Sequence, residues 1–189
     1  MAGSQFLCFG EYLLYKGTNS YNVNSCEIIE VFYNIRIDLD KLNYASQISK
    51  IIAEVTNENE NSYKVLQLLL NTLYIISQSD KDLNLILSIF KIRLSCILGF
   101  SPNIHECTQC KIKEGLNFFS FQNNGFKCNE CSKHDKSAIH INDTTVCAIR
   151  YIITSPAKKL YSFNVPNNCI KELQIISKIY LNEKLEKIS

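Results

Sequence analysis

Residues 107–131, with the sequence CTQCKIKEGLNFFSFQNNGFKCNEC, decide how this chain is interpreted. They contain two C-x2-C pairs with seventeen residues between them, and this spacing is typical of a four-cysteine zinc site. Two such pairs supply four thiolates to one tetrahedral ion, which leaves no coordination position for a catalytic water. The pattern therefore predicts a structural zinc ion with these ligands: Cys107, Cys110, Cys128 and Cys131.

The segment between the two pairs is long enough for a small hairpin, and Gly125 is available for its turn. His105 and His134 flank the site, but four cysteines already complete the coordination, so we expect both histidines to be exposed. Two other interpretations stay open, namely surface C-x2-C motifs without a metal and a redox pair. A redox motif is typically found after a strand in a βαβ pattern, and that pattern does not occur here.

Before this segment, apolar residues recur at the spacing of three helices. The first helix begins at Asp38 and is followed by a polar stretch at residues 57–61. The second runs from Ser62 to Gln78, and the third begins near Leu83. Gly99 stands where a helix C-cap needs a left-handed residue, so we expect the third helix to end there.

Two further helices are predicted after the cysteines. Asn142 or Asp143 can cap a helix that runs through Ile153, and a last helix begins near Pro166, a good first-turn residue.

The N-terminal residues indicate strands instead. An apolar and aromatic run at 6–15, a turn at 17–19 and a β-rich run at 21–32 predict one hairpin. Two strands cannot bury both of their faces, so we expect them to be part of something larger. The predicted fold class is therefore α+β, a mostly helical domain with an inserted four-cysteine zinc finger and a β segment before it.

Length and composition limit the class of protein. With 189 residues and 46% hydrophobic side chains, the chain can bury a core as one domain or as one domain with a small appendage. The sequence has neither the apolar run of a membrane span nor the pattern of a secretion signal. Nine cysteines, an odd number, favour a reduced cytoplasm over disulfides. Five of them are expected to be small buried hydrophobic residues: Cys8, Cys26, Cys96, Cys147 and Cys169.

Charge is divided unevenly along the chain. Residues 1–60 hold four basic and eight acidic side chains, whereas the later two-thirds is basic. An affinity for a polyanion therefore belongs to residues 61–189. In the stretch RYIITSPAKKLYSF, at 150–163, Arg150, Lys158 and Lys159 are the candidates for neutralising phosphates, because cations with neighbouring rings can hold single strands. The alternative is that the rings, Tyr161 and Phe163, pack inward while the lysines are solvated.

No catalytic constellation is visible in the sequence. It contains no Gly-rich phosphate loop, no G-x-S-x-G elbow and no H-E-x-x-H motif. Four neighbouring carboxylates have no basic or nucleophilic partner and are typical of a solvated face: Glu27, Glu30, Asp38 and Asp40. We therefore expect a protein that is not an enzyme.

Four stretches together resemble the RecO family of bacterial DNA repair proteins. They are GEYLLYKGTNSYNVNSCEIIEVFYNIRIDLDKLNYAS (10–46), FKIRLSCILGFSPNIHECTQC (90–110), FFSFQNNGFKCNEC (118–131) and IRYIITSPAKKLYSF (149–163). The resemblance implies an N-terminal OB-fold barrel, a helical domain with a zinc finger, and the four cysteine ligands named above. It also implies a cytoplasmic, nucleoid-associated mediator that binds and anneals single- and double-stranded DNA. With RecR, this mediator helps to load RecA onto strands coated with single-stranded-DNA-binding protein.

In these terms, residues 1–35 are the remnant of the barrel and residues 36–189 are the helical domain, with the finger at about 105–134. An OB-fold needs five strands, and only about two precede the helices, so we expect the front of the barrel to be missing. Because the barrel is the family's main DNA-binding part, a zinc-stabilised module that contacts RecR or single-stranded-DNA-binding protein without holding DNA is the alternative. A third possibility, an enzyme with a dispersed active site, predicts perturbed titratable groups that converge in a pocket.

The resemblance also implies a receptor for the tail of single-stranded-DNA-binding protein, which is acidic and ends in apolar residues. Such a receptor needs a cation beside an apolar groove, and Lys91 and Arg93 on the third predicted helix are the candidates.

Overall fold

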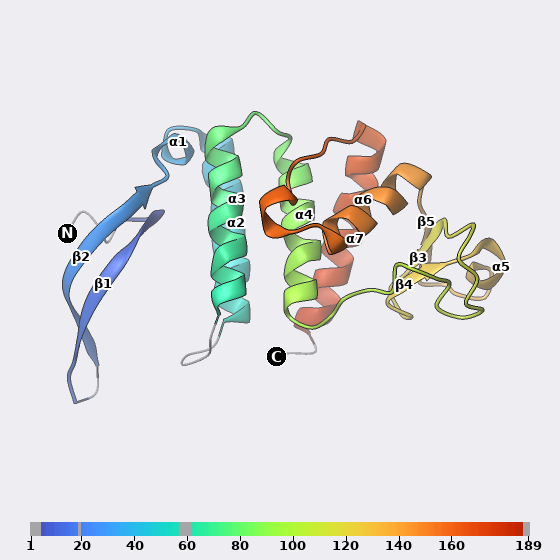
Figure 1. The fold of residues 1–189 in the computed structure, drawn as a ribbon, viewed down its shortest axis with the longest axis horizontal. Coiled ribbons are helices and arrows are strands. Elements are labelled where there is room, and N and C mark those ends of the chain that lie inside the picture. The colour runs from blue at the N-terminus through green and yellow to red at the C-terminus, as the bar shows by residue number, and fades with distance from the viewer. Residues whose placement is uncertain (1–4, 19, 57–61, 187–189) are drawn as a thin grey trace.

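The computed structural model describes residues 5–18, 20–56 and 62–186, and it shows three parts in a row (Figure 1). A β-hairpin at the N-terminal end is followed by a bundle of helices, and a small β lobe lies on the far side of the bundle. The hairpin consists of β1 (Cys8–Lys16) and β2 (Tyr21–Val31), which pair antiparallel. The short helix α1 (Tyr33–Arg36) leads from the hairpin into the bundle.

In the described part of the chain, the bundle consists of α2 (Leu39–Val55), α3 (Tyr63–Gln78), α4 (Leu83–Ile97), α6 (Asp143–Thr154) and α7 (Asn167–Leu185). A 3-10 turn, η2 (Ala157–Lys159), lies between α6 and α7. The β lobe is inserted between α4 and α6 and holds β3 (Phe118–Ser120), β4 (Gly125–Lys127), α5 (Asn129–Ser132) and β5 (Ala138–His140). β3 is the central strand and pairs antiparallel with both β4 and β5.

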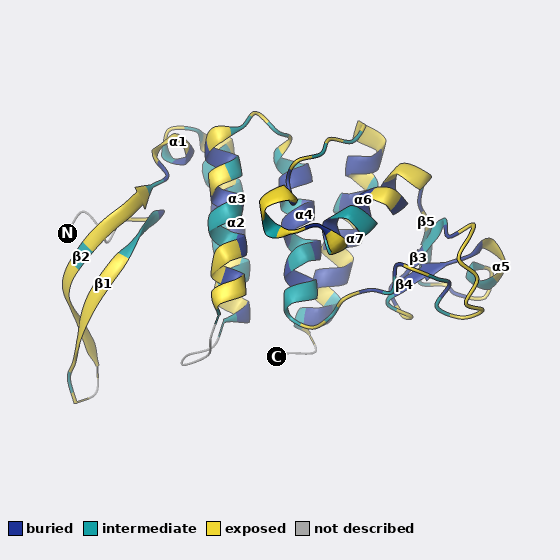
Figure 2. Ribbon diagram, in the orientation of Figure 1, coloured by how far each residue is buried: buried dark blue, intermediate teal, exposed yellow. Residues whose placement is uncertain are grey.

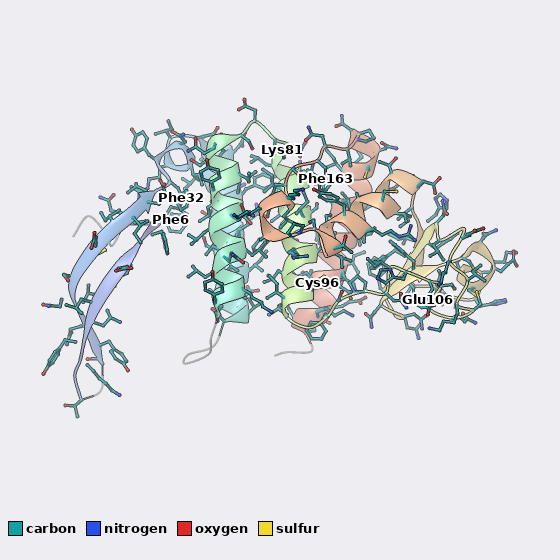
Figure 3. The ribbon with its side chains drawn as sticks, viewed as in Figure 1. Phe6, Phe32, Lys81, Cys96, Glu106 and Phe163 are labelled. Carbon is teal, nitrogen blue, oxygen red and sulfur yellow. The ribbon has the colours of Figure 1, made fainter. Side chains whose placement is uncertain are left out.

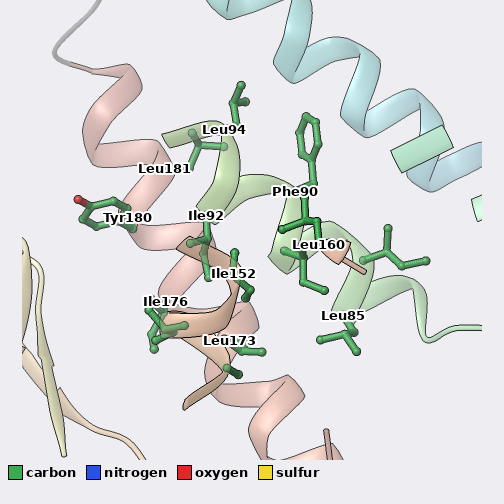
Figure 4. Packing of buried hydrophobic residues seen from close by; sticks show 14 of the residues in the cluster. Leu85, Phe90, Ile92, Leu94, Ile152, Leu160, Leu173, Ile176, Tyr180 and Leu181 are labelled. Carbon is green, nitrogen blue, oxygen red and sulfur yellow. The ribbon is translucent and has the colours of Figure 1, made fainter. Parts of the chain in front are cut away.

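The helix α4 is central to the bundle because its buried residues face more than one side. It packs against α3, α6 and α7. Figure 4 shows how the buried side chains of α4 and α7 pack together with those of α6 and of the turn after η2. The residues labelled there are Leu85, Phe90, Ile92, Leu94, Ile152, Leu160, Leu173, Ile176, Tyr180 and Leu181.

The predicted helix starts are confirmed where a side chain caps the backbone. The carboxylate of Asp38 accepts a hydrogen bond from Lys41 N at 3.0 Å, so the first long helix begins at Leu39. The amide oxygen of Asn142 accepts from Thr145 N at 2.9 Å, which starts α6. Pro166 occupies the N-cap of α7, one residue before its first turn.

The end of α4 is a Schellman motif, as the position of Gly99 indicates. Gly99 has a φ of 91°, in the left-handed region. Its N–H donates to Cys96 O at 3.1 Å, and Phe100 N donates to Ser95 O at 2.8 Å. These two bonds satisfy carbonyls that the helix leaves open, and the chain then turns toward the β lobe.

The β-hairpin is exposed on both faces (Figure 2). Leu13 is 60% exposed, Tyr15 70% and Ile29 56%. Its base is held where Phe32 is buried against the bundle. Figure 3 shows Phe32 near Phe6 at this junction. The described residues contain the two predicted strands without further strands beside them, so the OB-fold remnant and the domain division at residue 35 stay predictions.

The structure corrects the predicted burial of the cysteines and the predicted position of Gly125, and two predicted segments include residues outside those it describes. Among the five cysteines expected to be buried, only Cys169 is; Cys147 is exposed because it lies on the outer side of α6, and the other three are intermediate. The hairpin between the cysteine pairs exists, but Gly125 is the first residue of β4 and not part of its turn. Residue 19 of the predicted turn and the stretch 57–61 lie outside the described residues.

Candidate metal centre and basic surfaces

The four cysteines of the two C-x2-C pairs converge in the β lobe. Their sulfur atoms all lie within 4.8 Å of one another, and Cys110 Sγ is 3.7 Å from Cys128 Sγ. A tetrahedron of Zn–S bonds of about 2.3 Å has edges of about 3.8 Å, so the cluster has the dimensions of a four-thiolate metal site. His105 and His134 are exposed and belong to no such cluster in the described part of the chain.

The backbone around the first pair favours a thiolate. Burial raises the pKa of Cys107, but the backbone N–H groups of Cys110, Cys128 and Gln109 outweigh this effect and lower the pKa to about 6. The turn that aims these groups is closed by Lys111 N, which donates to Cys107 O at 3.1 Å, and Lys111 itself has a left-handed φ of 67°. The deprotonated sulfur is the form that a metal ion binds.

The last cysteine of the cluster shows the opposite effect. Desolvation and hydrogen bonds with the other three sulfur atoms raise the pKa of Cys131 to about 12. One negative charge in the cluster therefore disfavours the next. A divalent cation removes this repulsion by replacing the protons, so the donor set suits a cation and offers no open position for catalysis.

A buried ion pair holds the β lobe beneath the cysteines. Lys127 Nζ lies 2.8 Å from Asp135 Oδ2, and the two side chains are 4% and 1% exposed. Ser137 donates to the other carboxylate oxygen from its N–H at 2.9 Å and from its hydroxyl at 2.7 Å. The Ser120 hydroxyl also donates to Asp135. Burial raises the pKa of Asp135, but these donors outweigh it and hold the pKa well below its usual range.

The predicted nucleic-acid contact Arg150 joins the β lobe to the bundle. Its Nε donates to Ile104 O at 3.0 Å, and its guanidinium carbon lies 5.6 Å from the centroid of the Phe126 ring. These contacts occupy one donor and one face of the guanidinium. Arg150 lies on α6 with its guanidinium against the β lobe, whereas the other two predicted contacts, Lys158 and Lys159, lie on η2.

The C-terminal turns of α7 form a second junction with the β lobe. Tyr180 donates from its hydroxyl to Phe100 O at 2.9 Å and stacks edge to face on Phe119, with ring centroids 5.6 Å apart. Lys184 is 2% exposed, lies 4.6 Å above the Tyr180 ring, and donates to the Asn124 side chain. Nothing in the sequence indicates this role, because a lysine near the end of an amphipathic helix is ordinarily solvated.

Lys158 and Lys159 are exposed on η2, whereas the neighbouring rings pack inward. Tyr161 is 4% exposed, and its hydroxyl is 2.6 Å from Thr72 Oγ1. Phe163 is half-buried, and its carbonyl oxygen accepts from Lys81 Nζ at 2.7 Å; Figure 3 shows these two residues side by side. The expectation that the rings pack inward is confirmed for Tyr161 and holds in part for Phe163, while the role of the exposed lysines stays a prediction.

The structure separates Lys91 from Arg93. Arg93 Nη1 donates to the carbonyls of Ile152 and Ile153 near the end of α6, at 3.1 and 2.6 Å. Lys91 instead borders a cleft between α4 and α7. Side chains that are two positions apart on a helix point to different faces, so these two cations do not form one patch.

Arg93 borders a larger hollow over α3, which we call the α3 groove. It consists of two adjoining hollows of about 400 and 370 Å³ that share Gln67, Asn71 and Ala157. The first has a mixed lining that includes the cations Lys64 and Arg93; the second is mostly apolar. The second hollow is lined by Phe9, Tyr63, Leu66, Leu70 and Lys158 in addition to the shared residues. The sequence does not single out Lys64, because only packing shows that it lines a groove.

Comparison with known proteins identifies the family of this chain. The family model for the C-terminal part of recombination protein O matches residues 36–189. This chain is 39% identical to the DNA repair protein RecO of Acetivibrio thermocellus over 189 residues, which cover 99% of this chain and 75% of that protein.

Two further relatives carry the same name. The protein of Caldicellulosiruptor saccharolyticus is 29% identical over 188 residues, which cover 98% of this chain and 75% of the relative. That of Alkaliphilus metalliredigens is 27% identical over 190 residues, which cover 100% and 77%. The chain belongs to the RecO family.

None of the described helices is both long enough and apolar enough to cross a membrane.

Proposed function

We propose that this chain is a DNA repair and recombination mediator that acts by binding and not by catalysis. Membership of the RecO family supports the proposal, and the observation that carries it is the match of 39% identity to a DNA repair protein over nearly the whole chain. In this function it binds single- and double-stranded DNA and anneals complementary strands in the cytoplasm, at the nucleoid. With RecR, it helps to load RecA onto strands coated with single-stranded-DNA-binding protein.

The metal in this proposal is zinc, held by Cys107, Cys110, Cys128 and Cys131. Four sulfur donors at tetrahedral spacing and a backbone that favours a thiolate support a closed structural zinc site. The ion supplies rigidity to the lobe, and the lobe in turn contacts α6 and α7 through Arg150, Tyr180 and Lys184.

The DNA contact proposed on the bundle is the exposed lysine pair of η2. Lys158 also lines the mostly apolar hollow of the α3 groove, so cations border both hollows, with Lys64 and Arg93 at the first and Lys158 at the second. Such a surface attracts a phosphate backbone without reading sequence. Arg150 belongs to the same proposal only as a second contact, because its guanidinium already bonds to the β lobe.

The acidic, apolar tail of single-stranded-DNA-binding protein is the proposed ligand of the α3 groove. An apolar hollow with Phe9, Leu66 and Leu70 adjoins a basic one with Lys64 and Arg93, which is the combination that such a tail requires. Lys91 lies in a different cleft, so it contacts the tail only if a second segment of the partner reaches α7.

A second candidate is a zinc-stabilised interaction module that contacts RecR or single-stranded-DNA-binding protein and holds no DNA. The exposed hairpin favours this candidate, since eight large apolar side chains of its two strands lack a covering layer in the described residues. The two candidates differ in one property, which is salt-sensitive affinity of the isolated chain for DNA.

Annealing of labelled complementary strands, coated with single-stranded-DNA-binding protein, tests the proposal across a salt series. We expect annealing that falls steeply with salt. In the Lys158→Ala, Lys159→Ala variant the salt slope should be shallower, by about one for each phosphate that is no longer neutralised. The control is a double variant of equal charge, Lys50→Ala, Lys136→Ala, at exposed positions on α2 and in the β lobe. Absence of annealing by a folded, metal-loaded chain that still captures a partner would favour the interaction module.

A further inference from the structure

A small cleft between α4 and α7 lies apart from the metal centre and the α3 groove. Its volume is about 100 Å³, and side chains of both helices border it. Within the described part of the chain, none of its lining residues is acidic. The polar lining residues are Asn84, Ser88, Lys91, Gln174, Ser177 and Lys178.

Two cations face this cleft from opposite helices. Lys91 on α4 is half-buried, and Lys178 on α7 is exposed at the rim. Burial and the positive charge of Lys178 lower the pKa of Lys91, because two ammonium groups that border one cleft repel each other. Neither lysine takes part in the ion pairs found among the described residues. An anion between them would relieve both the repulsion and the desolvation.

Among the neutral polar groups of the cleft, the donors available to a ligand are the side-chain amides of Asn84 and Gln174. The hydroxyls of Ser88 and Ser177 already donate to the carbonyls of Asn84 and Gln174, at 2.7 and 3.2 Å, so they have no proton left for a ligand. The side-chain oxygen of Asn84 accepts from Tyr44 at 2.5 Å, which leaves its amide nitrogen as the group with free hydrogen-bonding capacity. The Gln174 amide offers a second donor of the same kind on the opposite helix.

We propose that this cleft is a binding site for a phosphate-type oxyanion, with Lys91 and Lys178 supplying charge and the amides of Asn84 and Gln174 supplying neutral donors. Two cations and two amide donors around a space of this size match a single tetrahedral oxyanion, which accepts hydrogen bonds on every side. Inorganic phosphate and the phosphodiester of a nucleic acid strand share this chemistry, and the cleft is too small for a base. As a site for free phosphate the cleft goes beyond the proposed function; as a phosphodiester site it rests on the proposed DNA binding and adds a contact apart from the α3 groove.

Titration of the full, metal-loaded chain with inorganic phosphate tests the proposal by two-dimensional amide NMR, against chloride at matched ionic strength. We expect saturable shifts centred on the backbone amides of Ser88 and Ser177. In Lys178→Gln the affinity should fall by about tenfold, the factor for loss of one charge-assisted hydrogen bond. Because Lys178 is exposed, this variant keeps the fold, and Lys50→Gln on α2 is the matched control that should bind as the parent does.

The second arm of the experiment distinguishes the sources of the phosphate. A short single strand with a 5′-fluorescein is titrated against the same three proteins. A loss of strand affinity in Lys178→Gln, beyond that in Lys50→Gln, assigns the cleft to a phosphodiester, whereas unchanged strand affinity assigns it to free phosphate. Shifts that phosphate and chloride produce equally, or an equal loss in the Lys50→Gln control, would overturn the proposal. The outcome does not depend on whether the chain anneals DNA.

Discussion

The Asp135→Asn substitution isolates the contribution of the buried ion pair to the β lobe. It removes the negative charge and keeps the shape, so Lys127 is left as a buried cation without a counter-ion. Because both side chains are almost fully buried, solvent does not screen the loss. Breaking one partner of such a pair costs about 3–5 kcal/mol, and four donated hydrogen bonds to this carboxylate place the site at the upper part of that range.

Urea unfolding of the metal-loaded chain measures this cost. The chain has no tryptophan, so far-ultraviolet circular dichroism and tyrosine fluorescence report the transition. The same lobe provides a matched control, the pair of Lys133 and Glu130, which has the same 2.8 Å separation but side chains 56% and 76% exposed. Glu130→Gln should change the free energy of unfolding by less than about 1 kcal/mol. If both variants cost the same, burial does not set the strength of the pair and the reasoning fails.

The pH dependence of the same variant has a defined sign. The pKa of Asp135 is lower in the folded chain than in the unfolded one, so its contribution is fully present above the unfolded pKa of about 3.9. It is lost as pH falls through the lower, folded value. We therefore expect the difference in stability between parent and Asp135→Asn to be constant near neutrality and to shrink below about pH 4. A difference that grows toward acid pH would contradict the depressed pKa.

Three further predictions concern the core, a close approach and the metal. Phe90→Ala, at a side chain 0% exposed in the centre of the bundle, should lower the free energy of unfolding by about 3–5 kcal/mol in the same urea assay, and a loss near zero would contradict the packing described for α4. Gly125→Ala should destabilise the lobe, because the new Cβ would lie 2.4 Å from Asn103 O, and proteolysis within residues 103–127 is expected to accelerate. Chelation of the metal should abolish the ordered amide NMR signals of β3–β5 while those of α2–α4 persist, and a lobe that stays ordered without metal would count against a structural ion.

The sequence is sufficient to predict the elements whose signals are local. Asp38 and Asn142 are capping residues, Gly99 is a C-cap signal, and the cysteine spacing identifies a cluster that the structure assembles. Each of these depends on a few neighbouring residues, so no knowledge of tertiary packing is required.

What could not be predicted depends on contacts between distant segments. The three-residue strand β5 carries no period, and Lys184 is an ordinary helix lysine until Asn124 approaches it from another element. The sequence suggests surface cations at Arg150 and Arg93, yet their guanidinium groups bond to carbonyls 46 and 59 residues away along the chain. Sequence reasoning identifies a charge correctly but cannot tell whether it faces solvent or another part of the chain.

The position of α7 in the sequence has a consequence for how the chain is made. The central helix α4 ends at Ile97, but α7, which covers much of it, is complete only at Leu185. At a synthesis rate of about 5–20 residues per second, roughly 4–18 s separate the appearance of these two helices. During this interval the β lobe can already bring its four cysteines together, because all of its strands precede α7, while one side of α4 is still uncovered. A nascent chain at this stage exposes the apolar side of α4, and both the core and the junction with the lobe are completed only when the last turns of α7 arrive.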